Sequence, residues 1–132
     1  MPPQACLPSV SRRSLLVGAA SATALAACSP LSAINTLLPS DGGSRQAAHD
    51  IAYGDDPRQK LDIYVPDGAT ASSPVMMFIY GGGWNDGSKS DYSFVGHAFA
   101  SRGFVTVVPD YRLVPQVRFP DFLHDCAQAL RW

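Results

Sequence analysis

The pattern of apolar and polar side chains is clearest in two short segments that a turn separates. Residues 61–65 alternate apolar and polar positions, which predicts a β-strand with one buried face. Residues 49–53 form a second strand candidate, and residues 54–57 between the two contain Gly, Asp and Pro, the side chains typical of turns. The two segments therefore predict an antiparallel hairpin whose other face is exposed.

Residues 75–80 are apolar without interruption, and residues 104–108 form a second such run that is rich in β-branched side chains, as parallel strands are when both faces are covered. Between them, residues 92–101 place apolar side chains at helical spacing, and Gly103 follows at a position typical of a helix C-cap. A strand, a helix and a second strand in succession form a crossover unit, which implies a parallel sheet.

A second helix is expected from about Pro120 to the last residue, Trp132. Its predicted apolar face consists of Phe122, Leu123, Cys126, Ala127 and Leu130. A hairpin followed by alternating strands and helices is an α/β arrangement. We therefore predict an α/β fold for residues 49–132, built from an antiparallel hairpin followed by parallel strands with a crossover helix.

Residues 1–27 have the pattern of a secretory signal peptide rather than of a folded domain. Arg12 and Arg13 precede an apolar run of about a dozen residues, whereas a membrane-spanning helix needs ~20. The arginine pair followed by two leucines resembles a twin-arginine export signal. Leu25-Ala26-Ala27-Cys28 resembles the lipobox of bacterial lipoproteins, in which the cysteine is acylated and becomes the mature N-terminus.

This resemblance predicts lipidation at Cys28 and an exported protein that its lipid anchors to the membrane of the bacterial cell envelope. The alternative is an ordinary signal peptide followed by an incidental cysteine. Residues 28–48 contain Pro30, Pro39 and several turn-forming or small polar side chains, so we expect a flexible tether there. The predicted order is therefore a signal peptide over 1–27, a tether over 28–48 and a folded domain over 49–132.

Composition places the folded part among ordinary globular proteins. Hydrophobic residues make up 46% of the chain and charged residues 16%, which argues against bulk disorder. The net charge of -1 lacks the excess of Lys and Arg that a nucleic-acid surface requires, so no nucleic-acid partner is expected. The three cysteines form neither a Cys-x-x-Cys motif nor a Cys/His cluster, and no metal or cofactor is implied.

Three consecutive glycines, Gly81, Gly82 and Gly83, directly follow the apolar segment 75–80. Without a Cβ, a glycine backbone can approach a ligand closely and can direct its N–H groups toward one atom. Acyl transfer needs such donors because negative charge develops on the carbonyl oxygen, and one fixed donor lowers the barrier by roughly 3–4 kcal/mol. The triplet is therefore a candidate oxyanion hole.

Residues 78–84 are similar to the HGGG-type oxyanion loop of lipases and esterases. Residues 102–104, 107–113 and 119–120 resemble the segments that follow this loop in the carboxylesterase and feruloyl-esterase-like branch of the α/β-hydrolases. The resemblance implies that residues 49–132 form the N-terminal portion of an α/β-hydrolase sheet, which is incomplete without the later strands of the family.

The resemblance also implies roles for the residues around the triplet. Gly82 and Gly83 would supply the N–H donors, Gly81 would support the loop, and Trp84 would line the mouth of the pocket. Tyr80 stands where the family usually has a His that braces the loop. A tyrosine hydroxyl can also donate and accept hydrogen bonds, so Tyr80 is expected to support the loop as well.

The nucleophile elbow of the family, Gly-x-Ser-x-Gly, and its acid and histidine all come after the second helix. No Gly-x-Ser-x-Gly occurs in this chain, so the catalytic Ser, acid and His are expected beyond Trp132. The resemblance therefore implies a fragment of a serine-dependent carboxylic-ester hydrolase with a small-molecule ester as substrate. The alternative is a non-catalytic envelope lipoprotein that uses a partial hydrolase fold as a binding module.

The histidines and Asp110 are expected to be structural. We interpret His49, His97 and His124 as surface residues or hydrogen-bonded core residues rather than as catalytic bases. Asp110 follows a predicted strand, and we expect it to pair with Arg112 or to cap the loop there.

Asp121 and Asp125 share one face of the second helix, where exposed carboxylates are commoner than catalytic pairs. The family's sheet places the 75–80 strand beside one that follows Trp132, so an apolar strand edge is predicted to be open. We therefore expect the chain, when expressed alone, to be poorly soluble and inactive on short acyl esters.

Overall fold

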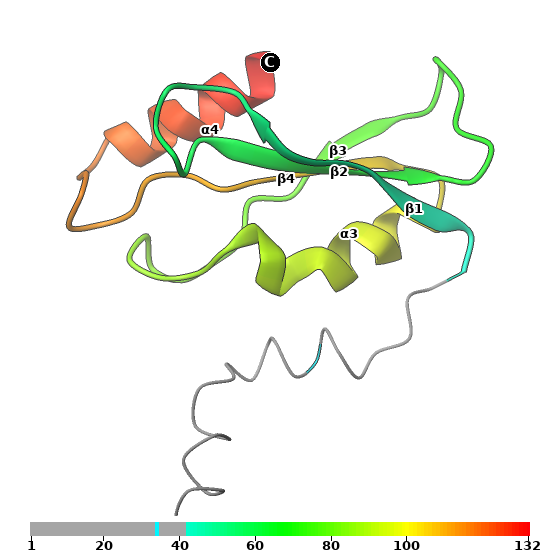
Figure 1. Ribbon diagram of the computed structural model, residues 1–132, viewed down its shortest axis with the longest axis horizontal. Coiled ribbons are helices and arrows are strands. Elements are labelled where there is room, and N and C mark those ends of the chain that lie inside the picture. The colour runs from blue at the N-terminus through cyan, green and yellow to red at the C-terminus, as the bar shows by residue number, and fades with distance from the viewer. Residues whose placement is uncertain (1–33, 35–41) are drawn as a thin grey trace, which may run out of the picture. The chain divides into compact units, whose positions relative to one another are not determined.

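The computed structural model describes residue 34 and residues 42–132, which contain a four-stranded mixed sheet (Figure 1). The strands are β1 Ser44–Ala52, β2 Lys60–Pro66, β3 Val75–Met77 and β4 Val105–Pro109, in the spatial order β1-β2-β4-β3. The helices are the short 3-10 helix η2 Lys89–Tyr92, then α3 Ser93–Ala100 and α4 Asp121–Arg131. The predicted signal peptide, the lipidation site at Cys28 and most of the predicted tether lie outside the described residues.

The predicted hairpin is confirmed, since β1 pairs antiparallel with β2. β1 begins earlier than predicted, at Ser44, so residues 44–48 belong to the strand and not to the tether. The sequence pattern misses them because β1 is an edge strand whose side chains are mostly exposed. Its pairing rests on backbone hydrogen bonds rather than on an alternation of apolar side chains.

The predicted crossover is also confirmed, because β3, α3 and β4 follow one another and β3 pairs in parallel with β4. β3 is shorter than predicted, and the chain leaves the sheet after Met77. Phe78 still donates its N–H to the carbonyl of Val107 at 2.8 Å. β4 pairs antiparallel with β2 on its other side, which joins the hairpin and the crossover in one mixed sheet.

Helices α3 and α4 lie on opposite sides of the sheet (Figure 1). On the α3 side, Tyr64 and Ala100 are fully buried, and a Cβ at Gly96 would overlap the Tyr64 ring. The glycine therefore allows α3 to approach β2 closely. This packing places the N-terminal end of α3, and the segment that leads into it, against the sheet.

The buried face of α4 differs from the predicted one. Phe122 and Cys126 are buried as expected, but Leu130 is 72% exposed. Asp125 and Ala129 are buried in its place, so the interpretation of Asp125 as an exposed carboxylate is wrong. A hydrophobicity pattern assigns a carboxylate to the surface, whereas the hydrogen-bond partners of Asp125 allow its carboxylate to be buried.

Asp125 is buried because Arg112 and Gln59 satisfy its carboxylate. Arg112 places Nε 2.8 Å from Oδ2 and Nη2 2.7 Å from Oδ1, and Gln59 donates from Nε2 to Oδ1 at 2.8 Å. Burial acts to raise the pKa of the Asp125 carboxyl, but the hydrogen bonds from Arg112 and Gln59 outweigh it and hold that pKa below its ordinary value. The expected pairing of Asp110 with Arg112 is therefore wrong, because Arg112 is engaged here.

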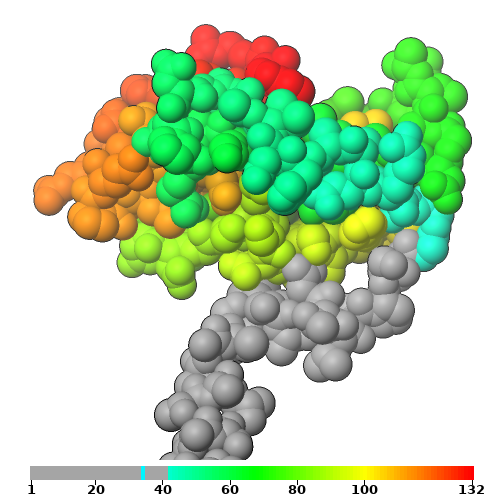
Figure 2. Space-filling model, in the orientation of Figure 1, coloured from blue at the N-terminus to red at the C-terminus, as the bar shows by residue number. Residues whose placement is uncertain are grey.

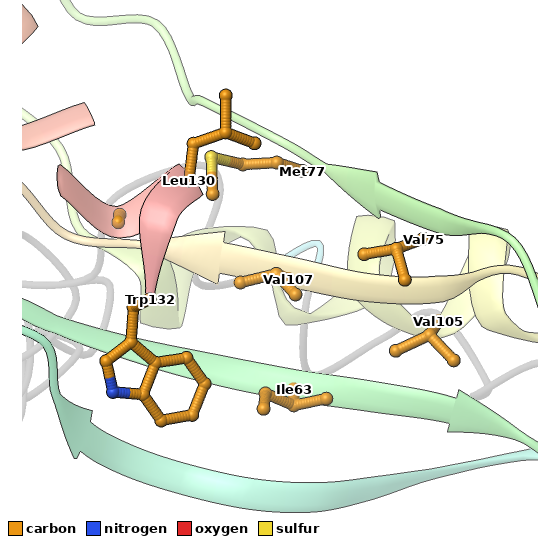
Figure 3. A pocket seen from close by; sticks show the side chains of 8 residues that line it. Ile63, Val75, Met77, Val105, Val107, Leu130 and Trp132 are labelled. Atoms are coloured by element: carbon orange, nitrogen blue, oxygen red, sulfur yellow. The ribbon is translucent and has the colours of Figure 1, made fainter. Parts of the chain in front are cut away.

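The sheet face beside α4 carries an open apolar groove of about 480 Å³ (Figure 3). Its lining comes from three strands and from the end of the chain: Ile63, Val75, Met77, Val105, Val107, Ala129, Leu130 and Trp132. Val75 is 70% exposed, and β3, which carries it, is an edge strand among the described residues, as predicted. The predicted poor solubility stays a prediction.

Within the described part of the chain, no helix combines the length and the hydropathy needed to cross a bilayer.

Replacing Asp125 by Ala should lower the free energy of unfolding by about 3 kcal/mol, because Arg112 would lose its buried partner. The loss should lie at the lower end of the range for broken buried ion pairs, because the Arg112 side chain is 29% exposed and water can partly replace the carboxylate. Urea denaturation followed by circular dichroism, on the protein that the complete reading frame encodes, measures the loss.

Asp121→Ala is the matched control, since Asp121 is exposed in the first turn of the same helix. Asp121→Ala should lower the free energy of unfolding by less than ~1 kcal/mol, the usual contribution of a charge at a helix end. The pKa of Asp125 is lowered in the folded state, so its contribution is present above the ordinary Asp pKa of about 3.9 and is lost as pH falls through the folded value. Equal losses for the two variants at neutral pH would contradict the prediction.

Candidate functional site

The glycine loop, residues 81–87, begins where the chain has left the sheet after β3. Its backbone takes positive φ angles in succession at Gly82 (136°), Gly83 (61°) and Trp84 (66°). Such angles are readily available to glycine and cost free energy for most other residues. A Cβ at Gly82 would also overlap the carbonyl oxygen of Asp86, so the loop closes on itself at a point where only glycine fits.

The amides of Gly82 and Gly83 are available to a ligand. Both glycines are exposed, and within the described part of the chain neither N–H has a hydrogen-bond partner. Two later amides of the loop are engaged, since Asn85 donates to the Gly82 carbonyl at 3.2 Å and Gly87 donates to the Asp86 carboxylate at 2.8 Å. The loop thus presents two consecutive donors without an internal acceptor, and consecutive backbone N–H groups of this kind can bind an anion.

Tyr80, the residue before the loop, is 2% exposed and is held through both its backbone and its hydroxyl. Its carbonyl accepts a hydrogen bond from the Tyr111 hydroxyl at 2.7 Å, and its own hydroxyl donates to Asp110 Oδ1 at 2.5 Å. Burial and the hydrogen bond to Asp110 raise the pKa of Tyr80 well above its ordinary value. The hydroxyl therefore stays protonated at neutral pH and remains a hydrogen-bond donor.

Aromatic rings pack around the two ends of the glycine triplet. The Tyr80 ring stacks between those of Tyr92 and Tyr111, with centroid distances of 5.3 Å and 4.8 Å. The Trp84 ring stacks on Phe122 of α4 at 4.4 Å. Trp84 is thus partly buried against the core, and its predicted place at the mouth of a pocket stays a prediction.

Asp110, the residue after β4, bonds the segments before and after the glycine loop, whereas its second expected role was in the loop that follows Asp110 itself. Its Oδ1 accepts the N–H of Lys89 at 2.7 Å in addition to the Tyr80 hydroxyl. Arg58, from the turn between β1 and β2, has Nη2 3.7 Å from the same oxygen. Sequence analysis missed Arg58 and Lys89, since nothing in their local sequence distinguishes them from other surface cations.

The histidines lie apart from the glycine loop. His97 Nδ1 is 3.0 Å from Ser44 Oγ, a serine–histidine contact that the spacing in the sequence does not reveal. Ser44 pairs with Pro66 at one end of β2, whereas Asp110 donates its N–H to the carbonyl of Lys60 at the other end. The Ser44–His97 contact therefore lies at the end of the sheet opposite to Asp110 and the glycine loop, which separates it from the candidate oxyanion donors.

One cluster of side chains has the composition of a metal site. In the described ranges, one group of side chains is close enough to hold an ion, namely His49, Asp50 and Asp62. The Lys89 ammonium already makes ion pairs with both carboxylates, at 2.7 Å to Asp50 and 2.8 Å to Asp62. Burial acts to lower the pKa of Lys89, but the hydrogen bonds to Asp50 and Asp62 outweigh it and raise that pKa, so the ammonium stays charged. A metal ion would have to displace this cation.

The mixed sheet, the crossover helix and the glycine loop at a strand end define the N-terminal portion of an α/β-hydrolase. Esterase B from Lactobacillus rhamnosis superimposes with a TM-score of 0.73 at 25% identity, over 91% of this chain and 38% of its own. A bacterial heroin esterase gives a TM-score of 0.64 at 28% identity, over 94% of this chain and 38% of its own.

The chain belongs to the BD-FAE family, whose model matches residues 61–132. The isoprenylcysteine alpha-carbonyl methylesterase ICME of Arabidopsis thaliana is 37% identical over 87 residues, which are 66% of this chain and 20% of that protein. Esterase LipC of Mycobacterium tuberculosis is 37% identical over 84 residues, 62% of this chain and 21% of LipC. The predicted esterase family is therefore confirmed, and the chain spans about a fifth of the length of the curated relatives it matches.

Gly82→Ala and Gly83→Ala should differ in their effect on the loop. At Gly83 a Cβ meets only Asn85 Oδ1 at 3.7 Å, so Ala should lower the free energy of unfolding by about 1 kcal/mol, the cost of a left-handed backbone. At Gly82 the overlap with the Asp86 carbonyl adds to the backbone strain, and the loss should be at least ~2 kcal/mol. Denaturant titration of both variants measures the two losses, and a smaller loss for Gly82→Ala than for Gly83→Ala would refute this description of the loop.

Proposed function

We propose that this chain is the N-terminal part of a serine-dependent carboxylic-ester hydrolase, in which the amides of Gly82 and Gly83 bind the oxyanion. The observation that carries the proposal is the pair of exposed, unpartnered N–H groups in the loop after β3, within the residues described. Family membership supports it, because BD-FAE relatives include proteins named as esterases.

The chemistry follows from where charge develops during ester cleavage. A serine hydroxyl attacks the ester carbonyl while a histidine accepts its proton, and negative charge moves to the carbonyl oxygen. The amides of Gly82 and Gly83 stabilise that charge only if they are held in place before the reaction begins. Each such donor accounts for about 2.7–4 kcal/mol of barrier in enzymes of this type.

The nucleophile, the acid and the base belong, on this proposal, to a part of the protein after Trp132. The seven serines between positions 42 and 132 all fall outside a Gly-x-Ser-x-Gly sequence. The contact of Ser44 with His97 lies at the opposite end of the sheet from the glycine loop, which argues against a local substitute for the triad. This chain then contributes the oxyanion donors and the first strands of the sheet.

The proposed substrate is a small molecule with a carboxylic ester bond. Two of the similar proteins are named as esterases of different substrates, an isoprenylcysteine methylesterase and a heroin esterase, and an ester bond is the feature that these two names share. The groups on the acyl and alcohol sides depend on pocket residues outside this segment. No metal or cofactor is part of the proposed reaction.

The protein encoded by the complete reading frame should hydrolyse p-nitrophenyl acetate and p-nitrophenyl butyrate. A fluorophosphonate should block this turnover by labelling one serine in a Gly-x-Ser-x-Gly that follows Trp132, where the family places the nucleophile. Mass spectrometry of the digested protein locates the label, and replacing that serine by Ala should abolish both labelling and turnover.

Two outcomes would decide against the hydrolase. One is turnover that persists when the labelled serine is replaced by Ala. The other is a stop codon directly after Trp132 together with binding of an ester that is never cleaved, which would favour the non-catalytic binding module.

We also propose that the protein is exported and anchored by acylation of Cys28. The support is the order of the arginine pair, the short apolar run and the Leu-Ala-Ala-Cys sequence. Lipid anchoring would hold the hydrolase at the envelope while residues 29–41 separate Cys28 from the start of the described domain.

Cys28→Ser should release the protein from the membrane fraction of a bacterial host, because serine removes the thiol that the lipid modifies. The wild-type protein should carry the mass of a diacylglycerol on its N-terminal peptide, and the variant should lack it. Cys126→Ser is the control, since this cysteine is buried in the core and should leave the distribution unchanged. Membrane attachment of Cys28→Ser equal to wild type would contradict the proposal.

A further inference from the structure

Arg58 contacts both ends of the glycine loop, although it precedes Tyr80 by 22 residues and Gly87 by 29. Its Nη2 donates to the Tyr80 hydroxyl at 3.0 Å and to the Gly87 carbonyl at 2.9 Å. Its Nε donates to the Tyr111 carbonyl at 2.9 Å. One guanidinium therefore bonds the residue before the loop, the last residue of the loop and the segment after β4.

The turn that carries Arg58 is itself fixed. The Arg58 N–H donates to Asp56 Oδ1 at 2.9 Å, and the Asp56 N–H donates to Gln59 Oε1 at 3.0 Å. These two hydrogen bonds stabilise the turn. Gln116 donates from Nε2 to Asp56 Oδ2 at 2.6 Å, and the space-filling view shows this turn beside the segment that precedes α4 (Figure 2). The Arg58 side chain therefore extends from a turn that hydrogen bonds hold in place.

The two ends of the glycine loop depend on Arg58 to different degrees. Tyr80 keeps two further hydrogen bonds, to Tyr111 and to Asp110. Within the described part of the chain, the Gly87 carbonyl accepts a hydrogen bond from Arg58 alone. Gly87 also lies against the Tyr80 ring, where a Cβ would come within 2.8 Å of a ring carbon. Arg58 is therefore the side chain that holds the end of the loop against its beginning.

We propose that Arg58 is a positioning residue for the oxyanion hole, a latch that joins Gly87 to Tyr80 and thereby holds the Gly82 and Gly83 amides in place. The kinetic part of this inference rests on the proposed ester hydrolysis. Arg58 does not touch the two amides, and it acts by closing the loop that carries them. Closure matters because oxyanion donors work only when they are oriented in advance, and a misplacement of about 1 Å can cost ~10²-fold in rate.

The guanidinium suits this role better than an ammonium would. It presents several N–H donors in a rigid plane, so it can bond two acceptors from Nη2 and a third from Nε without reorienting. A lysine ammonium is a single charged centre on a flexible stem. Arg58→Lys should therefore keep the positive charge near Asp110 and still fail to hold all three acceptors.

The test uses the protein encoded by the complete reading frame, as wild type, Arg58→Gln, Arg58→Lys and Arg45→Gln. We expect kcat for p-nitrophenyl butyrate to fall about 10- to 100-fold in Arg58→Gln with KM changed less than about 3-fold, the pattern of an interaction that acts in the transition state. Arg58→Lys should recover little of this loss. Arg45→Gln is the matched control, because Arg45 is exposed on β1 and makes no side-chain hydrogen bond among the residues described.

Hydrogen exchange at the Asn85 and Gly87 amides, which are hydrogen-bonded in the loop, provides a readout that does not require activity. Exchange at these two amides should be at least about 10-fold faster in Arg58→Gln than in wild type and unchanged in Arg45→Gln, because an opened latch lets the loop fluctuate. If the wild type hydrolyses no ester, the proposed hydrolase fails, and this exchange still decides whether the latch exists.

Three results would overturn the latch. The first is an Arg58→Gln protein whose exchange and kcat equal those of wild type. The second is full recovery of both quantities in Arg58→Lys. The third is an effect on exchange and kcat that is equal in Arg58→Gln and Arg45→Gln. Should Arg58→Gln not fold, Tyr80→Phe serves in its place, since it removes the hydroxyl that Arg58 bonds and keeps the stacked ring. A Tyr80→Phe protein with wild-type exchange at the Asn85 and Gly87 amides and wild-type kcat would likewise overturn the proposal.

Discussion

Four segments of the chain meet at Asp110, and the arrangement of the glycine loop depends on the hydrogen bonds made there. Its N–H donates to the Lys60 carbonyl at 2.8 Å, and its own carbonyl accepts the Tyr53 hydroxyl at 2.5 Å, which fixes the end of β4 to both strands of the hairpin. Its carboxylate accepts the Tyr80 hydroxyl and the Lys89 N–H. One residue thereby sets where the loop begins and where the chain continues toward α3, and a carboxylate suits this task because its oxygens can accept several hydrogen bonds.

The two faces of the sheet differ in how complete their packing is. On the α3 side the helix covers Tyr64 closely, whereas on the α4 side an apolar groove remains between the strands and Trp132. An exposed apolar surface of this kind is unfavourable in water and is usually covered by further structure. The glycine loop lies at the end of this sheet where Asp110, Arg58 and Tyr111 contact the loop and its neighbours. The proposed oxyanion donors are thus supported by contacts wholly within the described residues, independently of what covers the groove.

Tyr80, which the resemblance to HGGG-type esterases predicts to stand at the position of a histidine, supports the glycine loop through hydrogen bonds. A histidine there would be neutral or charged according to pH, whereas the raised pKa of Tyr80 keeps its hydroxyl a donor. The tyrosine ring also adds stacking with Tyr92 and Tyr111, and its hydroxyl reaches both Asp110 and Arg58. The support of the loop then depends on Asp110, Arg58 and a tyrosine whose hydroxyl stays protonated near neutral pH.

The sequence by itself determined the order of strands and helices, the parallel crossover and the place of the glycine triplet, because each of these follows from the spacing of side chains within a few neighbouring residues. Only the tertiary structure decided that β1 starts at Ser44, that Asp125 is buried and that Arg58 and Asp110 hold the loop. Each of these features depends on partners distant in the chain, 66 residues apart for Gln59 with Asp125 and 30 for Tyr80 with Asp110. Local patterns carry no information on which charged side chain finds which partner, since that choice is made when the folded sheet brings the segments together.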